Sequence, residues 1–491
     1  MIALAMIVVP LVAAALVMLA RRVLPLARVL AVAGAVATLV LAIFLPGTRP
    51  LDLTWLPGIG VSFSLDGNGA GSVLTFAAAL MMIPAVLVAT TRVASGAAGF
   101  AALLLVALGG LNGIFLAKDL VLFYVFWEAT LIPGLLLLGI WGGERRREAT
   151  VKYLVYAVTG SFFMLISILA VKALSGAASF HVIDLMLAAP ELPVATQTWL
   201  FVGLAIGMAV KLPIWPLHSW LVDLNEQNHP SGAADVLGSL YKVGAFGFFA
   251  WGLPLLPAGA LRVAPILLAL SAVTALYGAF GAIGSNHLKR FLAYGSLSHM
   301  GIIGVGVFGM HLAGMSGAMY FLAAQMVSTG GLFLIVGMLY HRRRSLYLAD
   351  YGGLAKAAPA LAAFTLFLIF TFIGVPGLSN FPGEFMSLLG AFQTSPWPAA
   401  IATLTVIAAG VYGVNLYQRL FQGRSEAVVK DLDALEMYVL LPVIVGVLLF
   451  GLMPAPHLQR IESQSQLAEL QLERAAAAPG GITLSDVGGA R

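Results

Sequence analysis

Apolar runs of roughly twenty residues follow one another along almost the whole chain, and they restrict what it can fold into. A run of this length crosses the hydrocarbon of a bilayer as a helix, whereas a soluble surface helix needs a polar face. Hydrophobic residues make up 60% of the chain and charged residues only 10%, which is far from the usual composition of soluble domains. The sequence therefore predicts an all-α, polytopic membrane protein.

Charged and Pro/Gly-rich breaks divide the chain into about fourteen candidate spans. These are residues 2–20, 27–46, 70–91, 98–117, 120–141, 153–175, 198–221, 232–256, 262–284, 291–310, 314–341, 359–393, 398–418 and 436–453. The first span enters its apolar run without a basic segment or a cleavage site, so we expect a retained helix rather than a signal peptide. The stretch 359–393 is too long for one straight helix, and two prolines within it predict a broken helix.

Lysine and arginine are unevenly divided between the connecting segments. Most fall on one side of the predicted bundle, including the triplets 145–147 and 342–344, the pair Lys289 and Arg290, and Arg424; Arg491 falls on the other. The positive-inside rule makes the first side cytoplasmic and places both termini outside. The basic residues form no soluble domain with interleaved aromatic residues, so nucleic acid is not an expected partner.

Five ionisable side chains lie inside the apolar runs, namely Glu128, Lys211, Lys242, His299 and Glu384. A charged side chain at the centre of a membrane helix costs roughly 2.5–3.5 kcal/mol on insertion scales, so each needs a partner, water or a function. Such residues commonly mark ion and proton paths. The alternatives without a function are a neutral acid for Glu128, an amine that reaches the membrane interface for Lys211, and a packed core residue for His299.

Two prolines follow Lys211 in the segment AIGMAVKLPIW and its continuation. Proline donates no hydrogen bond to the carbonyl four residues earlier, so Pro213 and Pro216 predict a break that leaves the carbonyls of Ala209 and Leu212 to water or polar side chains. A broken helix at membrane depth lines a hydrated cavity or is buried in protein. A buried lysine can release its proton there, whereas an arginine would stay charged.

The other buried groups extend this path. Glu128 is expected to pair with Lys211, so that moving either charge changes the proton affinity of the other. Lys242 comes roughly 16 Å of helix after Pro230, near the middle of the bilayer. His299 follows two nearby serines, and histidine is the side chain whose unperturbed titration lies closest to neutral pH. These residue types in this setting favour a proton relay.

A second proline-rich interruption precedes Glu384. The segment GVPGLSNFPG contains Pro376 and Pro382 and divides the twelfth span. The seventh and twelfth spans are thus both broken, and each is fourth in a group of five. Interruptions at matching places predict two inverted repeats with the ion path at the breaks. The expected units are a three-helix segment (1–97), two repeats (98–256 and 257–421), a last span (422–453), and a surface helix with a disordered tail (454–491).

Three polar residues follow the first break. Asp223, Glu226 and His229 fit no standard metal-ligand spacing, and we expect a solvated cytoplasmic turn that is a candidate proton entrance. Cysteine is absent, which excludes thiolate metal sites, cysteine-bound iron–sulfur clusters and disulfides on this chain. No metal and no cofactor is therefore expected here.

The motifs around these residues resemble one known family. The matching segments are 117–133 (AKDLVLFYVFWEATLIP), 210–220 (VKLPIWPLHSW), 240–247 (LYKVGAFG), 288–301 (LKRFLAYGSLSHMG) and 380–386 (NFPGEFM). Together they resemble the antiporter-like membrane subunits of respiratory complex I, the proton-translocating NADH-quinone oxidoreductase. Within these subunits they are similar to the M type, also known as the mitochondrial subunit 4 type. Glu384 marks that type, because the L and N types usually have lysine there.

The resemblance implies a subunit of a translocase in a bacterial cytoplasmic membrane, beside L-like and N-like subunits, with FMN, iron–sulfur clusters and quinone in partner subunits. It implies that Glu128 is the pair partner, Lys211 the switching lysine, Lys242 the central relay, His299 the connecting histidine and Glu384 the terminal carboxylate. Two departures stand out. Gln325 replaces a common histidine, and Asp223-Leu224-Asn225 replaces the usual Asp-Ala-His, which argues against a histidine-assisted entrance.

Two other interpretations stay open. The chain is alternatively a subunit of a multisubunit Na⁺/H⁺ antiporter or of a membrane-bound hydrogenase, although Glu384 argues against the antiporter. From another class, it is a non-pumping scaffold whose buried charges only fix the helix register.

Overall fold

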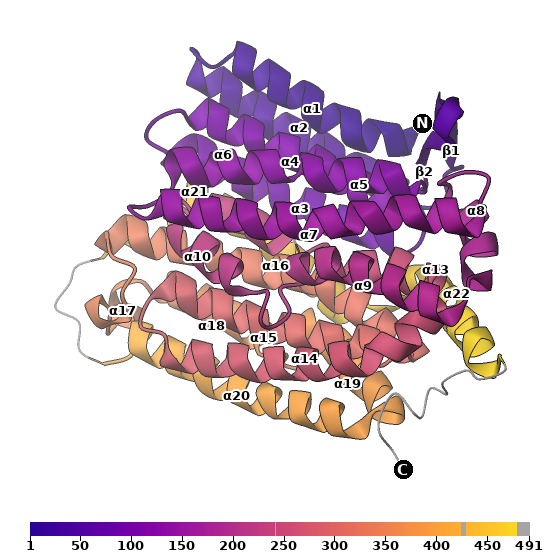
Figure 1. Ribbon diagram of the computed structural model, residues 1–491. Helices are drawn as coiled ribbons and strands as arrows, with labels where there is room; N and C mark the ends of the chain where they lie inside the picture. The colour runs from indigo at the N-terminus through magenta and orange to yellow at the C-terminus, as the bar shows by residue number, and fades with distance from the viewer. Residues whose placement is uncertain (241, 424–428, 479–491) are drawn as a thin grey trace.

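The computed structural model describes residues 1–240, 242–423 and 429–478, and its long helices run side by side in one bundle (Figure 1). Within this part of the chain, 12 helices are long and apolar enough to cross a membrane. They are α1 (Ile2–Leu19), α2 (Leu24–Phe44), α3 (Ala70–Arg92), α4 (Ala97–Leu116), the continuous pair α5 (Leu120–Ala129) and α6 (Leu131–Trp141), α7 (Arg146–Ser175), α9 (Val194–Lys211), α14 (Pro257–Gly284), α15 (Leu288–Phe308), α16 (Leu312–Arg343), α20 (Pro396–Phe421) and α21 (Ala434–Leu452). The all-α membrane fold is confirmed, while the count of fourteen spans stays a prediction.

Helices α15 and α16 form the centre of the bundle. The apolar windows of α15 and α16 are 94% and 100% buried, whereas those of α1, α7, α20 and α21 are each 39% buried. The outer helices therefore present large apolar side chains such as Phe162, Phe280 and Ile407 to their surroundings, as expected for a surface that faces lipid or neighbouring subunits. The polar residues of the central helices, in contrast, are enclosed by protein.

Both predicted breaks are present. Helix α9 ends at Lys211, and α10 (Ser219–Gln227) follows after a turn that contains Pro213 and Pro216. Helix α18 (Pro359–Phe372) ends before Pro376, and α19 (Asn380–Thr394) follows. Pro382, expected in the second break, lies instead in the first turn of α19, where a missing N–H leaves no helical bond unmade.

The two breaks have the same hydrogen-bond pattern. The N–H of Ile214 donates to the carbonyl of Ala209 at 3.1 Å, and the N–H of Val375 donates to the carbonyl of Phe370 at 3.0 Å. Each bond joins residues five positions apart just after the last helical residue. The carbonyl of Ala209 therefore has a backbone donor, and our expectation that it needs water or a polar side chain was wrong.

A third interruption divides the predicted span 232–256, which we expected as one helix. It consists of α11 (Ala233–Leu240), α12 (Gly244–Gly247), the π-helical turn η3 (Phe248–Gly252) and α13 (Leu253–Leu255). A Cβ built on Gly244 would lie 2.1 Å from the carbonyl oxygen of Met208 in α9. The glycine thus lets this interrupted segment approach the end of α9 at backbone contact.

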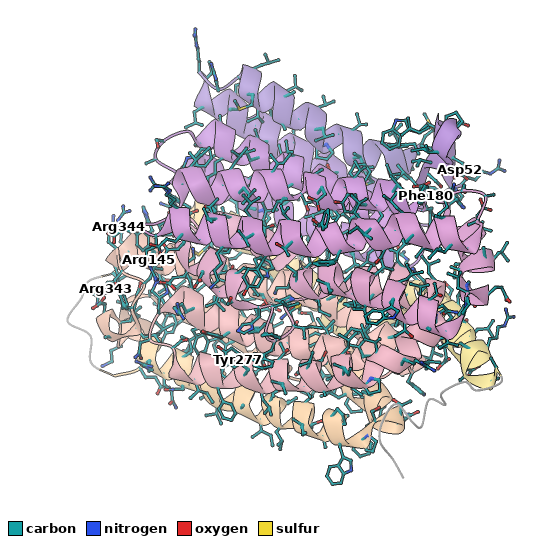
Figure 2. All side chains as sticks on the ribbon, viewed as in Figure 1. Asp52, Arg145, Phe180, Tyr277, Arg343 and Arg344 are labelled. Carbon is teal, nitrogen blue, oxygen red and sulfur yellow. The ribbon has the colours of Figure 1, made fainter. Side chains whose placement is uncertain are left out.

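The two ends of the bundle differ. Arg145, Arg343 and Arg344 lie at one end, called here the arginine end, and Asp52 and Phe180 lie at the other, called the hairpin end (Figure 2). The arginine end has the short elements η4 (Leu348–Asp350) and α17 (Leu354–Ala357). Its cytoplasmic orientation stays a prediction. Arg424 and Arg491 lie outside the described residues. So does the expected disordered tail, apart from the first residues of that tail.

The hairpin end also contains elements that the sequence analysis missed. Strands β1 (Leu51–Leu56) and β2 (Val61–Leu65) pair antiparallel around the short η1 (Pro57–Ile59). Helix α8 (Val182–Ala188), with η2 (Ala189–Glu191), lies at the same end. So does the long helix α22 (Ala455–Ala477), which falls in the segment 454–491 where a surface helix was expected (Figure 1). Helix α22 contacts the bundle through Ile461, Ser465, Ala468 and Leu472, which are all buried.

Candidate functional site

Lys211 and Glu128 are brought together by helices α9 and α5. The Lys211 side chain is 2% exposed, and its Nζ lies 5.5 Å from the ring centroid of Trp127 and 5.9 Å from that of Tyr153. Glu128 follows Trp127 in the chain, and its charge acts on Lys211. An aromatic face attracts an ammonium group, and a nearby carboxylate does so more strongly. Glu128 and the two rings thus favour the charged form of Lys211, whereas its burial opposes that form.

Lys242 belongs to a buried polar cluster at the centre of the bundle. It lies in the interruption between α11 and α12, and its Nζ donates hydrogen bonds to Ser296 Oγ and, at 3.5 Å, to Gln325 Oε1. Gln325 Nε2 in turn donates to the carbonyl oxygen of Ser296 at 3.3 Å. Gln325, noted from the sequence only as a departure from a common histidine, therefore contacts the central lysine directly.

His299 lies one helical turn after Ser296 on α15 and is 1% exposed. Neither of its ring nitrogens has a hydrogen-bond partner among the described residues. Its ring lies 4.5 Å from the ring of Phe372 and 5.3 Å from that of Phe321, centroid to centroid. The histidine ring is thus packed against two apolar rings.

Glu384 lies beside the second break, on α19. Its side chain is 4% exposed, and its Oε1 has no hydrogen-bond partner among the described residues. A Cβ built on Gly374 would lie 2.1 Å from Oε2, so the carboxylate lies against the backbone of the second break. The hydroxyl of Tyr412 on α20 is also buried without a partner in this part of the chain, and the charge of Glu384 acts on it.

The sequence analysis missed Tyr412. Its ring lies 6.4 Å from that of Phe372, so one phenylalanine ring contacts both His299 and Tyr412. The available signal was a tyrosine hydroxyl within the apolar helix α20, which a sequence alone does not place beside a carboxylate.

Asp223 and Glu226 are in a network of ion pairs at the arginine end. The two residues lie on α10 rather than in the solvated turn that we expected. Asp223 pairs with Lys152 at 2.6 Å, and Glu226 pairs with Arg145 and with Arg290, each at 2.5 Å. Burial acts to raise the pKa of Glu226, but the hydrogen bond and charges of the two arginines outweigh it and lower that pKa.

His229 does lie in the turn after α10. Its ring contacts the ring of Phe100 at 5.8 Å, centroid to centroid, and its carbonyl oxygen accepts a hydrogen bond from Lys289 Nζ at 3.3 Å. Burial and the charge of Lys289 lower the pKa of His229 to about 4, so the ring is neutral near pH 7.

A fully buried ion pair lies beneath this network. Lys289 Nζ and Asp235 Oδ2 are 2.8 Å apart, and both side chains are 0% exposed. Lys289 also donates to the carbonyl oxygen of Asn228 at 2.8 Å, and the Asn228 amide donates to Asp235 Oδ1 at 3.1 Å. We assigned Lys289 to a connecting segment because it precedes Arg290, and that placement was wrong. The pair fixes the first residues of α11 against α15, and so helps to position Lys242.

The described residues contain no group of three or more His, Cys, Asp or Glu side chains that could hold a metal ion. The site consists instead of single ionisable groups on adjoining helices, with helix interruptions beside them. Residues 117–409, which contain all five groups, match the family of the transmembrane region of NADH:quinone oxidoreductases and Mrp antiporters.

The chain belongs to this NADH:quinone oxidoreductase/Mrp antiporter family.

Relatives in this family align with most of the chain. It is 43% identical to NADH-quinone oxidoreductase subunit 13 of Thermus thermophilus, over 88% of this chain and 92% of that protein. It is 32% identical to NADH-quinone oxidoreductase subunit M of Escherichia coli K12, over 86% of this chain and 84% of that protein. The M-type resemblance of the motifs is therefore confirmed.

Solved structures of the family agree. A chain of respiratory complex I from Thermus thermophilus superposes with a TM-score of 0.91 at 40% identity, covering 96% of this chain and 99% of that one. A chain of the Mrp complex from Dietzia sp. DQ12-45-1b superposes with a TM-score of 0.78 at 21% identity, covering 96% and 98%. The second likeness is one of fold alone.

Proposed function

We propose that this chain is a proton-translocating, antiporter-like membrane subunit of NADH:quinone oxidoreductase, and that protons cross it by way of Glu128, Lys211, Lys242, His299 and Glu384. The observation that carries the proposal is the set of buried groups Lys211, Lys242, His299 and Glu384 inside the bundle, three of which, Lys211, Lys242 and Glu384, lie at or near a helix interruption. Irregular backbone and ionisable side chains at membrane depth mark ion paths.

The first step is a change of proton affinity at Lys211. Glu128 and the rings of Trp127 and Tyr153 stabilise its ammonium form. Moving the carboxylate away, or neutralising it, removes the largest of these stabilising interactions. Lys211 then holds its proton less tightly and releases it toward the centre of the bundle.

The second step passes the proton through the cluster around Lys242. The Ser296 hydroxyl both donates and accepts hydrogen bonds, so it can connect the lysine to the next turn of α15, where His299 lies. Gln325 does not titrate, and its carbonyl oxygen orients the Lys242 amine. Lys242 is therefore the titratable member of the cluster that it forms with Ser296 and Gln325.

The third step carries the proton past Phe372 to Glu384. The rings of His299 and Tyr412 contact Phe372, and the charge of Glu384 acts on Tyr412. Both ring nitrogens of His299, the hydroxyl of Tyr412 and Oε1 of Glu384 have no hydrogen-bond partner among the described residues. Polar groups in this state are suited to bind transient water. We infer that water enters when Phe372, the last helical residue of α18, moves with the break, and that Glu384 discharges the proton at the hairpin end.

Protons enter at the arginine end in this proposal. Asp223, Glu226 and His229 lie there, but the two carboxylates are held in ion pairs and the histidine ring faces Phe100. Entry therefore requires the pairs with Lys152 and Arg290 to open. Redox energy comes from partner subunits that hold FMN, iron–sulfur clusters and quinone, and the expected neighbours in the membrane are L-like and N-like subunits.

Purification of the tagged chain from its native membrane tests the assembly. Recovery with flavin and iron–sulfur subunits that oxidise NADH supports the proposal. Recovery with only small membrane subunits would instead indicate a multisubunit antiporter.

Replacement of Lys211 by alanine in the assembled complex tests the relay. We expect proton pumping to be lost while the complex still assembles, because alanine cannot hold a proton. Lys172→Ala is the matched control, since Lys172 lies over the ring of Phe180 at the hairpin end, outside the path. Normal pumping by Lys211→Ala would contradict the relay and favour the interpretation of the chain as a non-pumping scaffold.

A further inference from the structure

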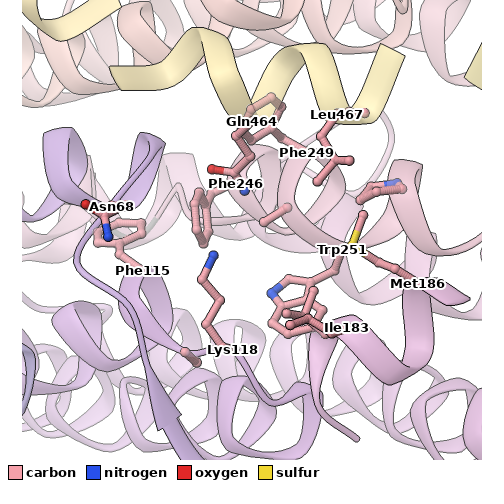
Figure 3. A pocket seen from close by; sticks show the side chains of 16 residues that line it. Asn68, Phe115, Lys118, Ile183, Met186, Phe246, Phe249, Trp251, Gln464 and Leu467 are labelled. Atoms are coloured by element: carbon pink, nitrogen blue, oxygen red, sulfur yellow. The ribbon is translucent and has the colours of Figure 1, made fainter. Parts of the chain in front are cut away.

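A cavity at the hairpin end lies apart from the proposed relay. Its volume is about 170 Å³, and it is enclosed by the segment after α4, by α8, by η3 and by α22 (Figure 3). A water molecule occupies about 30 Å³ in the liquid, so the space holds about five waters or one small polar group. Nothing in the proposed proton path uses it.

Hydrogen-bond donors converge in this cavity. Lys118 directs its amine toward Phe246 and the side chain of Gln464, while Trp251 supplies an indole N–H and Gln464 an amide (Figure 3). Lys118 Nζ lies 3.5 Å from Asp66 Oδ2, which takes at most one of its three donors. The remaining donors and the positive charge suit an anionic oxygen.

The backbone fixes Lys118 in this orientation. Its N–H donates to the carbonyl of Ser64 in β2 at 2.9 Å, and its carbonyl accepts from the N–H of Val182 at 2.8 Å. The residue is thus held between the hairpin and the start of α8, two elements that place it at the mouth of the cavity. These bonds fix the main chain of Lys118, from which its flexible side chain reaches the cavity.

The rim of the cavity is apolar. Ile183 on α8 and Leu467 on α22 line it and are 60% and 43% exposed. Aromatic walls from Phe115, Phe246 and Phe249 continue inward. The cavity is too small for an acyl chain, but a chain can lie along the rim while a headgroup enters. A single anionic group with an attached apolar tail fits this combination.

We propose that the cavity binds the phosphate of an anionic phospholipid. The phosphate accepts hydrogen bonds from Lys118, Trp251 and Gln464, and the acyl chains lie over Ile183 and Leu467. The headgroup then contacts Phe246 and Trp251, which belong to the interrupted segment that follows Lys242. Binding therefore steadies that segment. This last consequence, unlike the binding itself, rests on the proposed relay.

Single introduced cysteines test the binding without reference to pumping. The chain has no cysteine, so Leu467→Cys and Leu470→Cys each add one unique thiol to it. Both leucines are on α22 and both are 43% exposed, but only Leu467 lines the cavity. The intact complex carrying either variant is reconstituted in phosphatidylcholine vesicles with or without phosphatidylglycerol, and maleimide labelling of the α22 peptide is measured by mass spectrometry.

Phosphatidylglycerol is expected to slow labelling of Leu467→Cys by about tenfold at near-saturating occupancy and to leave Leu470→Cys unchanged. Equal responses of the two thiols, or no response of either, would overturn the proposal. Inorganic phosphate is added in a parallel sample. Protection by inorganic phosphate alone would show a site for a soluble anion and would overturn the assignment to lipid.

Charge variants complete the test. Lys118→Gln in the Leu467→Cys background is expected to weaken protection by about tenfold, because a charge-assisted hydrogen bond is lost. Lys172→Gln removes one positive charge from the same end of the bundle and is expected to leave protection intact. Ala250→Phe, which fills the cavity from its wall, gives a second variant that should lose protection if Lys118→Gln fails to assemble. Full protection in an assembled Lys118→Gln or Ala250→Phe complex would contradict the site.

Discussion

Gly374 and Glu384 lie so close together that a Cβ on Gly374 would be 2.1 Å from Oε2 of the glutamate. Gly374 has a φ of +76°, in the left-handed region, and is the second residue after the end of α18. The second helix break is therefore one wall of the site that holds the Glu384 carboxylate. Its shape and the position of Glu384 depend on each other.

Gly374→Ala should displace the Glu384 carboxylate. Gly377→Ala is the matched control, because Gly377 lies in the same break with a φ of +89° and has open space where a Cβ would be. Both variants bear the left-handed strain of a non-glycine residue, about 1–2 kcal/mol. We expect the fall in NADH-driven proton uptake per assembled complex to be at least about tenfold greater in Gly374→Ala than in Gly377→Ala. The reason is that a displacement of a reacting group by about 1 Å can slow a reaction about a hundredfold. Equal losses would assign the effect to backbone strain alone.

Ser296→Ala should slow proton transfer from Lys242. It removes the hydroxyl that accepts a hydrogen bond from the lysine, and a hydrogen bond to a charged group contributes about 1.5–3 kcal/mol. We therefore expect pumping to slow by about tenfold or more. Ser298→Ala, two residues along α15, removes only a bond to the carbonyl of Ala275 and should pump at nearly the normal rate. The measurement is the initial rate of vesicle acidification, and a larger defect in Ser298→Ala would contradict the assignment.

His287 should make stability depend on pH at the arginine end. It caps α15, where its Nδ1 accepts a hydrogen bond from the N–H of Arg290 at 3.4 Å. Burial lowers the pKa of His287 to about 4; Glu226 opposes this shift, and the nearby cations Lys289 and Arg290 reinforce it. Since the pKa is about 6.5 in an unfolded chain, the unfolded state binds the proton first. This contribution to stability is complete above about pH 6.5 and is lost as the pH falls toward about 4.

His287→Asn keeps a capping acceptor but does not titrate. Acidification from about pH 7 to about pH 5 should therefore lower the thermal unfolding midpoint less in the variant than in the unaltered protein. Differential scanning calorimetry of the purified complex measures both midpoints. An equal decrease in the two proteins would show that His287 does not contribute to the pH dependence.

The sequence predicts the buried charges well because an apolar context is a local property. Lys211 and Glu384 are identified by the residues on either side of them, and the prolines nearby predict the breaks. Lys289 was assigned with Arg290 to a connecting segment, because only the tertiary fold brings Asp235 to it. A buried pair between distant residues leaves no local pattern.

Contacts within the relay are equally beyond local reasoning. Gln325 and Ser296 meet Lys242 because α15 and α16 pack at the centre of the bundle, and Tyr412 meets Glu384 because α20 packs beside α19. The expectation that Pro213 frees a carbonyl for water failed because a backbone N–H five residues on can replace the missing donor. Residue types point to candidate groups, and packing decides what each of them touches.

Glu384→Gln gives the most direct test of proton passage through this chain. Glutamine matches glutamate in size but neither binds nor releases a proton near neutral pH. The measurement is the number of protons moved into sealed vesicles per NADH oxidised, together with the pumping rate per assembled complex. Our account predicts that the pumping rate falls and that any remaining NADH oxidation moves fewer protons. A rate and a proton-to-NADH ratio equal to those of the unaltered complex would contradict it.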